Sequence, residues 1–276
     1  MSLIHRFFSQ WRRPAAAPPA SVPSVTLEQY EALNPMVEIA DGDTSVIFCT
    51  PTSGTKWRAD TLFTKEPDTI AWIGGFQKDE VLVDIGANVG MYTIWAAKTR
   101  DVRVFAFEPE SQNYALLYRN IVANNLSEQV TAYCLALSNE RAYSKLHLSK
   151  FFLGGSCHTF GAKIDYLLRP RESKVSQGCV AVTLDELVST GTIEQPDYIK
   201  IDVDGLEHKV LAGANSTLLN SRLKSVLVEL NTHLSEHLAV IEMLQSVGFS
   251  YSPEQVAQSL RKSGDFEGCG NHVFHR

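Results

Sequence analysis

An acid, Asp84, stands directly before a glycine-rich turn in the stretch VLVDIGANVG. The apolar run Val81–Val83 predicts a buried parallel strand, and Gly86 and Gly90 permit a tight turn whose backbone amides lie open beneath a bound molecule. Dinucleotide enzymes hold pyrophosphate at such turns, but their pattern is GxGxxG and their acid comes about twenty residues later. Here Asn88 takes the position of the second glycine, and the acid comes first. This order favours a cationic ligand.

The charge of Asp84 argues against a bound diphosphate. A carboxylate about 4 Å from a like charge costs on the order of 4 kcal/mol at an effective dielectric constant of about 20. S-adenosylmethionine carries ammonium and sulfonium charges, so it suits an acid at this place. We therefore predict an S-adenosylmethionine site on the turn and on the helix after it. The residues assigned to it here are Asp84, Gly86, Ala87, Asn88, Gly90 and Tyr92.

A second acid, Glu108, ends the next apolar run, VFAFEP, before Pro109, which cannot continue the ladder of a central strand. Ligands of doubly wound sheets lie beyond the carboxyl ends of the strands, so Glu108 is predicted to face the same crevice as the glycine turn. A carboxylate there can accept both hydroxyls of a ribose. A third strand is predicted over Val130–Leu137, and its end, at Ala136, is expected near the adenine ring.

Acids also crowd the end of a fourth predicted strand, in DYIKIDVDGLEHKVLAG. In strict alternation Asp202 and Asp204 point to the same side, so both can reach the crevice. A fifth run, SVLVEL, brings Glu229, Asn231 and His233 to the same opening. The carboxyl ends of the fourth and fifth strands are therefore predicted to carry the remaining polar groups of the site, and Asp202 is also assigned to the cofactor.

The composition excludes several classes of protein. With 276 residues, 44% of them hydrophobic, the chain can bury a large core, and no apolar run approaches the ~20 residues that cross a bilayer. A net charge of −6 offers no basic footprint for nucleic acid. Five cysteines, odd in number and without a CxxC pair, indicate neither a disulfide framework nor a zinc knuckle. A reducing, cytoplasmic location is the simplest inference, and nothing in the sequence indicates an oligomeric state.

Residues 1–27 differ from the rest because they are basic, then rich in Ala, Pro and Ser, and free of acids. We predict a tail outside the core. Three interpretations stay open: a flexible linker, an amphipathic helix that associates weakly with a membrane surface through residues 1–13, or an organelle transit peptide, which would replace the cytoplasmic location.

Two further segments follow the tail. Residues 28–78 predict a hairpin that turns through Asp41 and Gly42, and a helix opened by Pro67, both packed on the core. Residues 79–276 predict the catalytic domain, an α/β fold whose strands and helices alternate around a doubly wound, mostly parallel sheet with closing antiparallel strands. Within that domain Ser111 is expected to cap a helix. Residues 138–180 break the alternation of strands and helices: a strand-like run, YSKLHLS, leads into a longer stretch, and the whole segment is predicted to be a mobile flap.

These motifs together resemble a known family. The segments VLVDIGANVGMYT, VFAFEPE, LALSNE, TLDEL, YIKIDVDGLEHKVLAG and SVLVEL are similar to those of the FkbM-type methyltransferases, from about Met36 to the C-terminus. The resemblance implies the class I, Rossmann-like fold and dependence on S-adenosylmethionine. It also implies O-methylation of a hydroxyl on a sugar, a polysaccharide or a natural product, and it puts Glu66 near the methionine moiety of the cofactor.

A sugar hydroxyl has a very high pKa, so a base or a divalent ion near its oxygen should help the transfer. The candidate bases are Asp204, Glu207, His208 and His233, of which Asp204 ranks first and His233 second. Mg²⁺ prefers oxygen ligands, and the candidate ligands are Asp202, Glu229 and Asn231.

Two other functions remain open. The sequence Asp-Val-Asp at 202–204 also resembles the short acidic motif with which many glycosyltransferases hold a metal and a nucleotide sugar, although Asp84 before the glycine turn argues against a diphosphate. The third function is a cofactor-binding module without catalysis. A thermal shift comparison of S-adenosylmethionine with nucleotide sugars and dinucleotides separates the three, because a ligand of the folded form raises the melting temperature.

Overall fold

The computed structural model describes residues 25–276, which divide between Asn34 and Pro35 into two units. The predictions for residues 1–24, including the surface helix and the transit peptide, lie outside the described residues. The first unit contains the short helix α1 (Leu27–Ala32), which begins with a capping box. Its Thr26 side chain accepts a hydrogen bond from the Gln29 N–H, and the Gln29 side chain accepts one from the Thr26 N–H.

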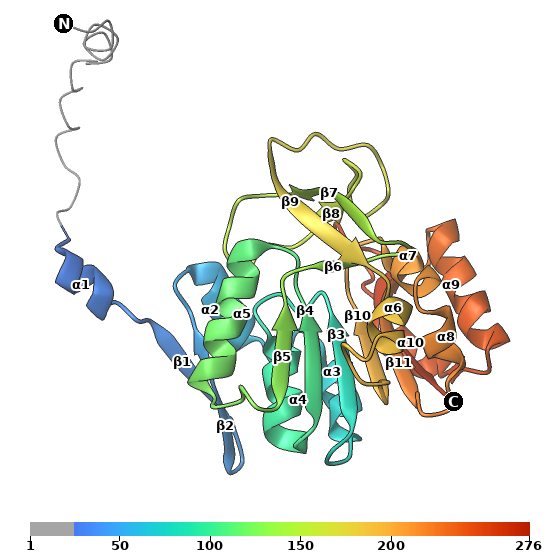
Figure 1. Cartoon of the computed structure of the whole chain (residues 1–276), viewed down its shortest axis with the longest axis horizontal. Coiled ribbons are helices and arrows are strands. Elements are labelled where there is room, and N and C mark those ends of the chain that lie inside the picture. Colours follow the sequence, from blue (N-terminus) through green and yellow to red (C-terminus); the bar gives the residue numbers. More distant parts are fainter. Residues whose placement is uncertain (1–24) are drawn as a thin grey trace, which may run out of the picture. The chain divides into compact units, whose positions relative to one another are not determined.

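A seven-stranded sheet forms the centre of the second unit (Figure 1). The strand order is β12-β13-β11-β10-β3-β4-β5; β13 is antiparallel to both of its neighbours, and the other neighbouring strands are parallel. This confirms the predicted α/β, Rossmann-like fold with its antiparallel closing strand. The strands are β3 (Val81–Ile85), β4 (Arg103–Phe107), β5 (Val130–Tyr133), β10 (Tyr198–Ile201), β11 (Ser225–Asn231), β12 (Ser250–Tyr251) and β13 (Cys269–His275).

The central strands are apolar because helices cover both faces of the sheet. Every residue of β3 and β10 is buried, as is typical of parallel strands that pack on both sides. Two of these buried residues are charged: Asp84 and Lys200 lie opposite each other in the β3–β10 register, near the carboxyl ends. These two charged residues interrupt otherwise apolar strands, and they do so near the carboxyl ends, where the site is predicted.

Two apolar cores lie on the two faces. The first receives residues from the hairpin and from α2 (Ser53–Asp60), α3 (Pro67–Gly74), α4 (Met91–Arg100) and α5 (Ser111–Ala123). The second receives residues from α6 (Leu184–Ser189), α7 (Glu207–Ala212), α8 (Asn215–Leu219) and α9 (Ser235–Ser246). A further helix, α10 (Pro253–Ser259), packs against β13. Across residues 25–276, no helix combines the length and the apolar character needed to cross a membrane.

The predicted hairpin is present as β1 (Met36–Asp41) and β2 (Thr44–Cys49). Its turn is Gly42 and Asp43, one residue later than predicted, because Gly42 takes the left-handed conformation at φ +56°. Asn120 of α5 and Asn124, the C-cap of α5, bind the backbone of β2. The Ile47 N–H donates to Asn124 at 2.8 Å, and the Cys49 N–H donates to Asn120 at 2.7 Å.

The helix that flanks the site differs from the prediction in its cap. Glu110, rather than Ser111, precedes α5 as the N-cap, and its carboxylate accepts from the Asn113 N–H at 2.8 Å. A carboxylate is well placed there because the N-terminus of a helix carries partial positive charge. The helix α3, by contrast, begins at Pro67 and ends at Gly74 as predicted.

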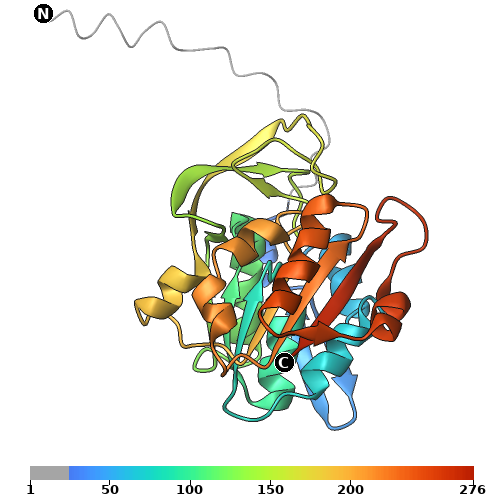
Figure 2. The ribbon, with the colours of Figure 1, turned by 90° about the vertical axis from the view of Figure 1, so that its right-hand side faces the viewer.

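The flap, residues 138–180, is largely a second sheet rather than irregular chain. It contains β7 (Ala142–Leu148), β8 (Thr159–Phe160) and most of β9 (Val175–Val182), in the order β6-β9-β7-β8. The strand predicted over Val130–Leu137 is therefore two strands: β5 stays in the main sheet, and after a bend at residues 134–135 the strand β6 (Ala136–Leu137) joins the small one. Figure 2 shows the flap above the end of the main sheet.

Candidate functional site

A cavity of about 410 Å³ opens at the carboxyl ends of the parallel strands. Predicted residues from the ends of β3, β4, β10 and β11 meet in it: Gly86, Asn88, Glu108, Asp202, Asp204 and Glu229. Side chains from α2, from the flap and from the loop before β13 complete its wall, and the sequence did not predict these. They include Trp57, Arg58, His158, Arg261 and Phe266.

The first loop requires glycine at Gly86 for two reasons. Its φ is +83°, and a Cβ atom there would overlap the backbone carbonyl oxygen of Asp202. The β10 loop therefore crosses directly over the β3 loop, which leaves no room for a side chain. Gly90, with φ +86°, precedes α4 as its N-cap. Asn88 points to the flap, where its Nδ2 donates to the Gly155 carbonyl at 2.7 Å.

Asp84 lies beneath the loop rather than open to the cavity. It is 1% exposed, and its Oδ2 accepts from Thr93 Oγ1 at 2.5 Å. Burial raises the pKa of Asp84, and the charge of Lys200 in the neighbouring strand opposes that rise. A small recess off the main cavity is lined by Asp84 and Lys200 together with Ala87 and Tyr92. The positive charge beside Asp84 in this structure is therefore Lys200, a residue of the protein, where the sequence predicted a cationic ligand.

Glu108 is held by two backbone amides. Its Oε2 accepts from the Asn88 N–H at 2.8 Å, and its Oε1 accepts from the Glu110 N–H at 2.8 Å. Burial raises the pKa of Glu108 to about 7, although both hydrogen bonds favour the ionised form. The carboxylate ties the β3 loop to the end of β4 and lines the cavity.

Glu66, at the start of α3, is a buried and ionised acid. It forms an ion pair with Lys65 and accepts hydrogen bonds from Thr69 and Asn271. Burial opposes its charge, but Lys65 and Lys200 lower the pKa of Glu66 to about 2. The nearby Glu66 charge contributes, after burial, to raising the pKa of Tyr92.

An apolar recess lies on the other side of Gly86. Ala136, 6% exposed, lines it with Phe107 and Val203. Small and apolar side chains of this kind can pack on a flat heterocycle. Ala136 therefore lies beside the glycine loop as the sequence interpretation requires, although it belongs to the small sheet.

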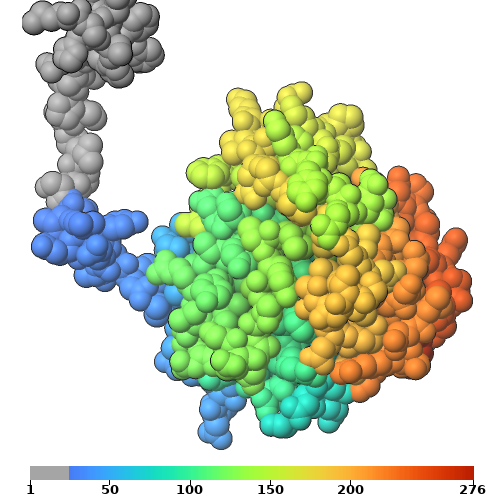
Figure 3. All heavy atoms as spheres, viewed as in Figure 1, coloured from blue at the N-terminus to red at the C-terminus, as the bar shows by residue number. Residues whose placement is uncertain are grey.

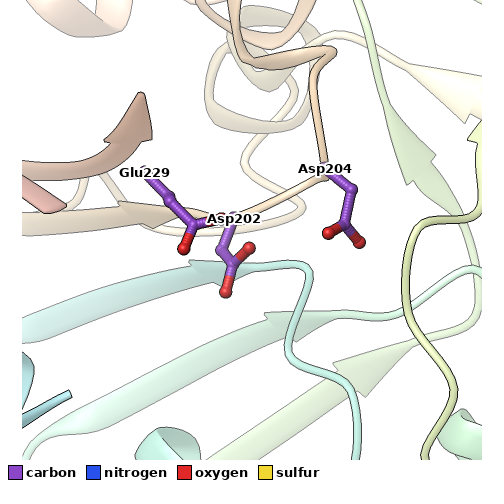
Figure 4. Close-up of side chains that lie close together, drawn as sticks. All are labelled: Asp202, Asp204 and Glu229. Carbon is purple, nitrogen blue, oxygen red and sulfur yellow. The ribbon is translucent and has the colours of Figure 1, made fainter. Parts of the chain in front are cut away.

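Three carboxylates converge at the end of β10 and β11. Each of Asp202, Asp204 and Glu229 offers an oxygen within 4.8 Å of the other two, and Figure 4 shows Asp202 between the other side chains. Asp204 reaches this position through a left-handed backbone conformation, φ +56°, and not through the alternation of a strand. Burial, with the charge of Asp202, raises the pKa of Asp204 to about 6 and that of Glu229 to about 8.

Each carboxylate already has a partner within the chain. Asp202 pairs with Lys200 at 3.3 Å, and Glu229 pairs with Arg261 at 2.8 Å. Asp204 accepts from the Cys157 N–H of the flap at 2.6 Å.

The two remaining predicted residues, Asn231 and His233, contact each other at the end of β11. Asn231 turns its Oδ1 back to accept from the His233 N–H at 2.9 Å, a local bond that asparagine favours. Asn231 also lines a small recess together with Asp204 and Glu229, and the three carboxylates that converge are those of Asp202, Asp204 and Glu229. His233 is exposed and is not among the described residues that line the main cavity.

The sequence model of the methyltransferase FkbM domain matches residues 84–251. The chain belongs to this family. It is 25% identical over 194 residues to methyltransferase 1 of Beauveria bassiana, covering 66% of this chain and 77% of that protein. It is 26% identical over 159 residues to the hexuronic acid methyltransferase AglP of Haloferax volcanii, covering 56% and 57% respectively. It is 25% identical over 197 residues to the 31-O-demethyl-FK506 methyltransferase FkbM of Streptomyces tacrolimicus, covering 64% and 75%.

Membership of the FkbM family supports methyltransferase activity for this chain. A match to the AMB antimetabolite synthetase AmbE of Pseudomonas aeruginosa spans only 10% of that protein. Among solved structures, precorrin-6y C5,15-methyltransferase from Geobacter metallireducens is 16% identical with a TM-score of 0.45, covering 79% of this chain and 92% of that one.

The methyltransferase also contains a buried brace that the sequence did not predict. The Glu207 carboxylate, 1% exposed, accepts from the Val203 and Gly205 N–H groups at 3.0 Å each. His237 Nε2 lies 3.0 Å from Glu207, and His237 Nδ1 accepts from the Asn231 N–H at 2.8 Å. This pair holds the turn that carries Asp204 against the end of β11. The one sequence feature that could have predicted this contact is the acid, Glu207, two residues after the glycine in DVDGLE.

The flap of the methyltransferase is fastened over the cavity by polar contacts from three elements. Asn88 and Asn113 both donate to the Gly155 carbonyl, and Asn113 also accepts from the Gly154 N–H. Arg58 of α2 donates to the Gly154 carbonyl at 2.7 Å. On the face seen in Figure 3, the surface of the flap continues into that of the domain beneath it.

Proposed function

We propose that this methyltransferase uses S-adenosylmethionine to methylate a hydroxyl of a sugar, a polysaccharide or a natural product. One observation supports S-adenosylmethionine as the cofactor: a buried carboxylate, Glu108, is held by backbone amides in the same cavity as the glycine loop. The names of two relatives specify acceptors, a hexuronic acid and 31-O-demethyl-FK506, and both support an oxygen nucleophile.

The cofactor residues follow from their places around the loop. The apolar recess at Ala136 and Phe107 suits the adenine, and Glu108 suits the ribose hydroxyls. Asp202 lies between the main cavity and the small recess, where the sulfonium and the methionine end belong. The residues proposed for cofactor binding are Glu66, Asp84, Gly86, Ala87, Asn88, Gly90, Tyr92, Glu108, Ala136 and Asp202.

The acceptor would occupy the part of the cavity lined by α2 and by the loop before β13, where Trp57 and Phe266 provide aromatic surface. When bound, S-adenosylmethionine supplies an activated methyl group. The protein has to hold the hydroxyl oxygen in line with that group and take up its proton. Asp204 lines this cavity and is the preferred base; His233 is the second candidate, although it is exposed.

A magnesium ion would fit the Asp202, Asp204 and Glu229 group by chemistry, since all three offer carboxylate oxygens. Lys200 and Arg261 already neutralise two of these carboxylates. We therefore expect protein treated with EDTA to keep its methyl-transfer activity. Activity that is lost in EDTA and restored by added Mg²⁺ would assign the ion instead.

The proposal is tested by calorimetry and by a labelled methyl-transfer screen over glycans and polyols. Glu108→Ala should bind S-adenosylhomocysteine at least tenfold more weakly, whereas Glu128→Ala, an exposed acid, should bind it normally. Asp204→Asn should bind the ligand normally and lose turnover; full turnover would remove Asp204 as the base. Stabilisation by a nucleotide sugar instead would favour a glycosyltransferase, and binding without turnover on any acceptor would favour a non-catalytic module.

A further inference from the structure

We infer that Lys200 binds the α-carboxylate of the methyl donor. The inference rests on the proposed use of S-adenosylmethionine and adds a residue that neither the motifs nor the relatives assign. It starts from an unusual placement, because lysine is almost never fully buried unless it is paired. Lys200 is 2% exposed and lies in the middle of the central sheet.

The Lys200 ammonium is fixed in the small recess that adjoins the glycine loop. Its Nζ lies 5.3 Å from the centre of the Tyr92 ring and 3.3 Å from the Asp202 carboxylate. Asp84 lies beside it in the neighbouring strand. The same recess reaches Gly86, so it begins where the donor's sulfur would lie.

The ammonium retains capacity for a ligand. A lysine ammonium has three N–H donors, and within residues 25–276 Lys200 uses one of them, toward Asp202. One acceptor on the wall of the recess, Asp84 Oδ1, is buried without a partner among the described residues. Buried polar atoms are normally satisfied, so the recess is built for a polar occupant.

The charges of the recess match an α-amino acid. Asp84, Asp202 and the nearby Glu66 suit an ammonium group, but they would repel the carboxylate attached to the same carbon. Lys200 supplies the opposite charge in their midst. A methionine moiety can then direct its ammonium to the acids and its carboxylate to Lys200.

Two other cations reach the recess and are engaged elsewhere. Lys65 lies nearer the surface, with its side chain 22% exposed, and forms an ion pair with Glu66. Arg58 directs its Nε to the Gly154 carbonyl of the flap. Lys65 therefore provides a matched control: it is a lysine that lines the same recess but is less buried than Lys200.

The test compares three ligands by calorimetry. S-adenosylhomocysteine has the whole amino acid, S-adenosyl-3-thiopropylamine lacks only the carboxylate, and methylthioadenosine lacks both charged groups. The wild-type protein should bind S-adenosylhomocysteine at least tenfold more tightly than the decarboxylated ligand. Lys200→Met should abolish that preference, Lys65→Met should keep it, and both should bind methylthioadenosine as the wild type does.

A wild-type protein that does not distinguish the two larger ligands would overturn the inference, and so would a Lys200→Met protein that still does. If Lys200→Met does not fold, the double variant Asp84→Asn with Lys200→Gln removes an acid and the lysine together, and the same loss of preference is expected. A protein that binds none of the three ligands would instead refute the proposed function.

Discussion

At the scale of single residues, the acids of this site are held in two ways. Glu108 depends on the backbone amides of Asn88 and Glu110. Asp202 and Glu229 depend on the side chains Lys200 and Arg261. Substitution of those cations would leave Asp202 or Glu229 without its charged partner, whereas the groups that hold Glu108 belong to the backbone.

The raised pKa of Glu108 makes cofactor binding depend on pH. The group is ionised above about pH 7 and protonated below it. A protonated carboxyl loses an acceptor for the ribose hydroxyls, so affinity for S-adenosylhomocysteine should fall by up to about tenfold from pH 7 to pH 6. Calorimetry at a series of pH values measures this. Glu108→Gln should bind weakly at every pH with no such slope, and a flat wild-type profile between pH 6 and 8 would contradict the prediction.

The sequence identifies single residues where a motif is local. Asp84, Gly86 and Glu108 lie at the ends of β3 and β4 because a strand followed by a turn can be recognised from the residues themselves. The partnership of Asp84 with Lys200 could not be predicted, since it depends on how β10 aligns with β3, more than a hundred residues away. Register is fixed by the packed sheet, not by either strand alone.

At the scale of elements, the Asp204 turn owes its shape to Glu207 and His237. The left-handed φ of Asp204 is unfavourable for a residue with a side chain, so surrounding contacts must impose it. The Glu207 carboxylate does so by accepting hydrogen bonds from the N–H groups of Val203 and Gly205, the residues on either side of Asp204. The predicted alternation of Asp202 and Asp204 places them together for the wrong reason, because a turn rather than a strand carries the second acid.

Replacement of Glu207 by Gln should therefore disturb the turn. The amide side chain has one acceptor oxygen, which cannot serve both the turn and His237. A buried N–H group, of the turn or of His237, therefore loses its partner, at a cost of about 1–3 kcal/mol in the free energy of unfolding. Urea denaturation measures that loss. Methyl transfer should fall more than S-adenosylhomocysteine binding, because Asp204 moves while the glycine loop stays. Lys209→Ala, on the outer part of the same helix, should change neither quantity.

The flap is the element that the sequence describes least well. Residues 138–180 are predicted to be a mobile flap with one strand-like run, YSKLHLS, and β7 confirms that run; the sequence does not predict β9, which seven consecutive pairs join to β7. The strands lie about thirty residues apart and carry many exposed positions, so their alternation is weak. The sequence could not predict the hydrogen bonds from Asn88 and Asn113 to Gly155 either, because asparagine is common in turns and helices for other reasons.

At the scale of the whole molecule, the alternation of strands and helices was sufficient to predict the class of fold. Parallel strands require crossovers, and right-handed crossovers limit the arrangements that a sequence can adopt. The N-terminal boundary of the folded unit differs from the prediction. The prediction separated residues 1–27, whereas the described residues divide between Asn34 and Pro35. The hairpin falls on the folded side, since Val46 and Phe48 belong to the first core.

We therefore propose that residues 35–276 fold and bind cofactor as one unit, and two truncations test this. A chain that begins at Pro35 keeps both cores and every residue of the site, so its melting temperature and its affinity for S-adenosylhomocysteine should match those of the full chain. A chain that begins at Thr50 loses Val46 and Phe48, each almost fully buried, at about 1.5–3 kcal/mol per side chain. It also leaves Asn120 and Asn124 without the hairpin amides they bind. The second chain should melt well below the first; equal losses in both would mean that residues before Pro35 contribute to the folded unit.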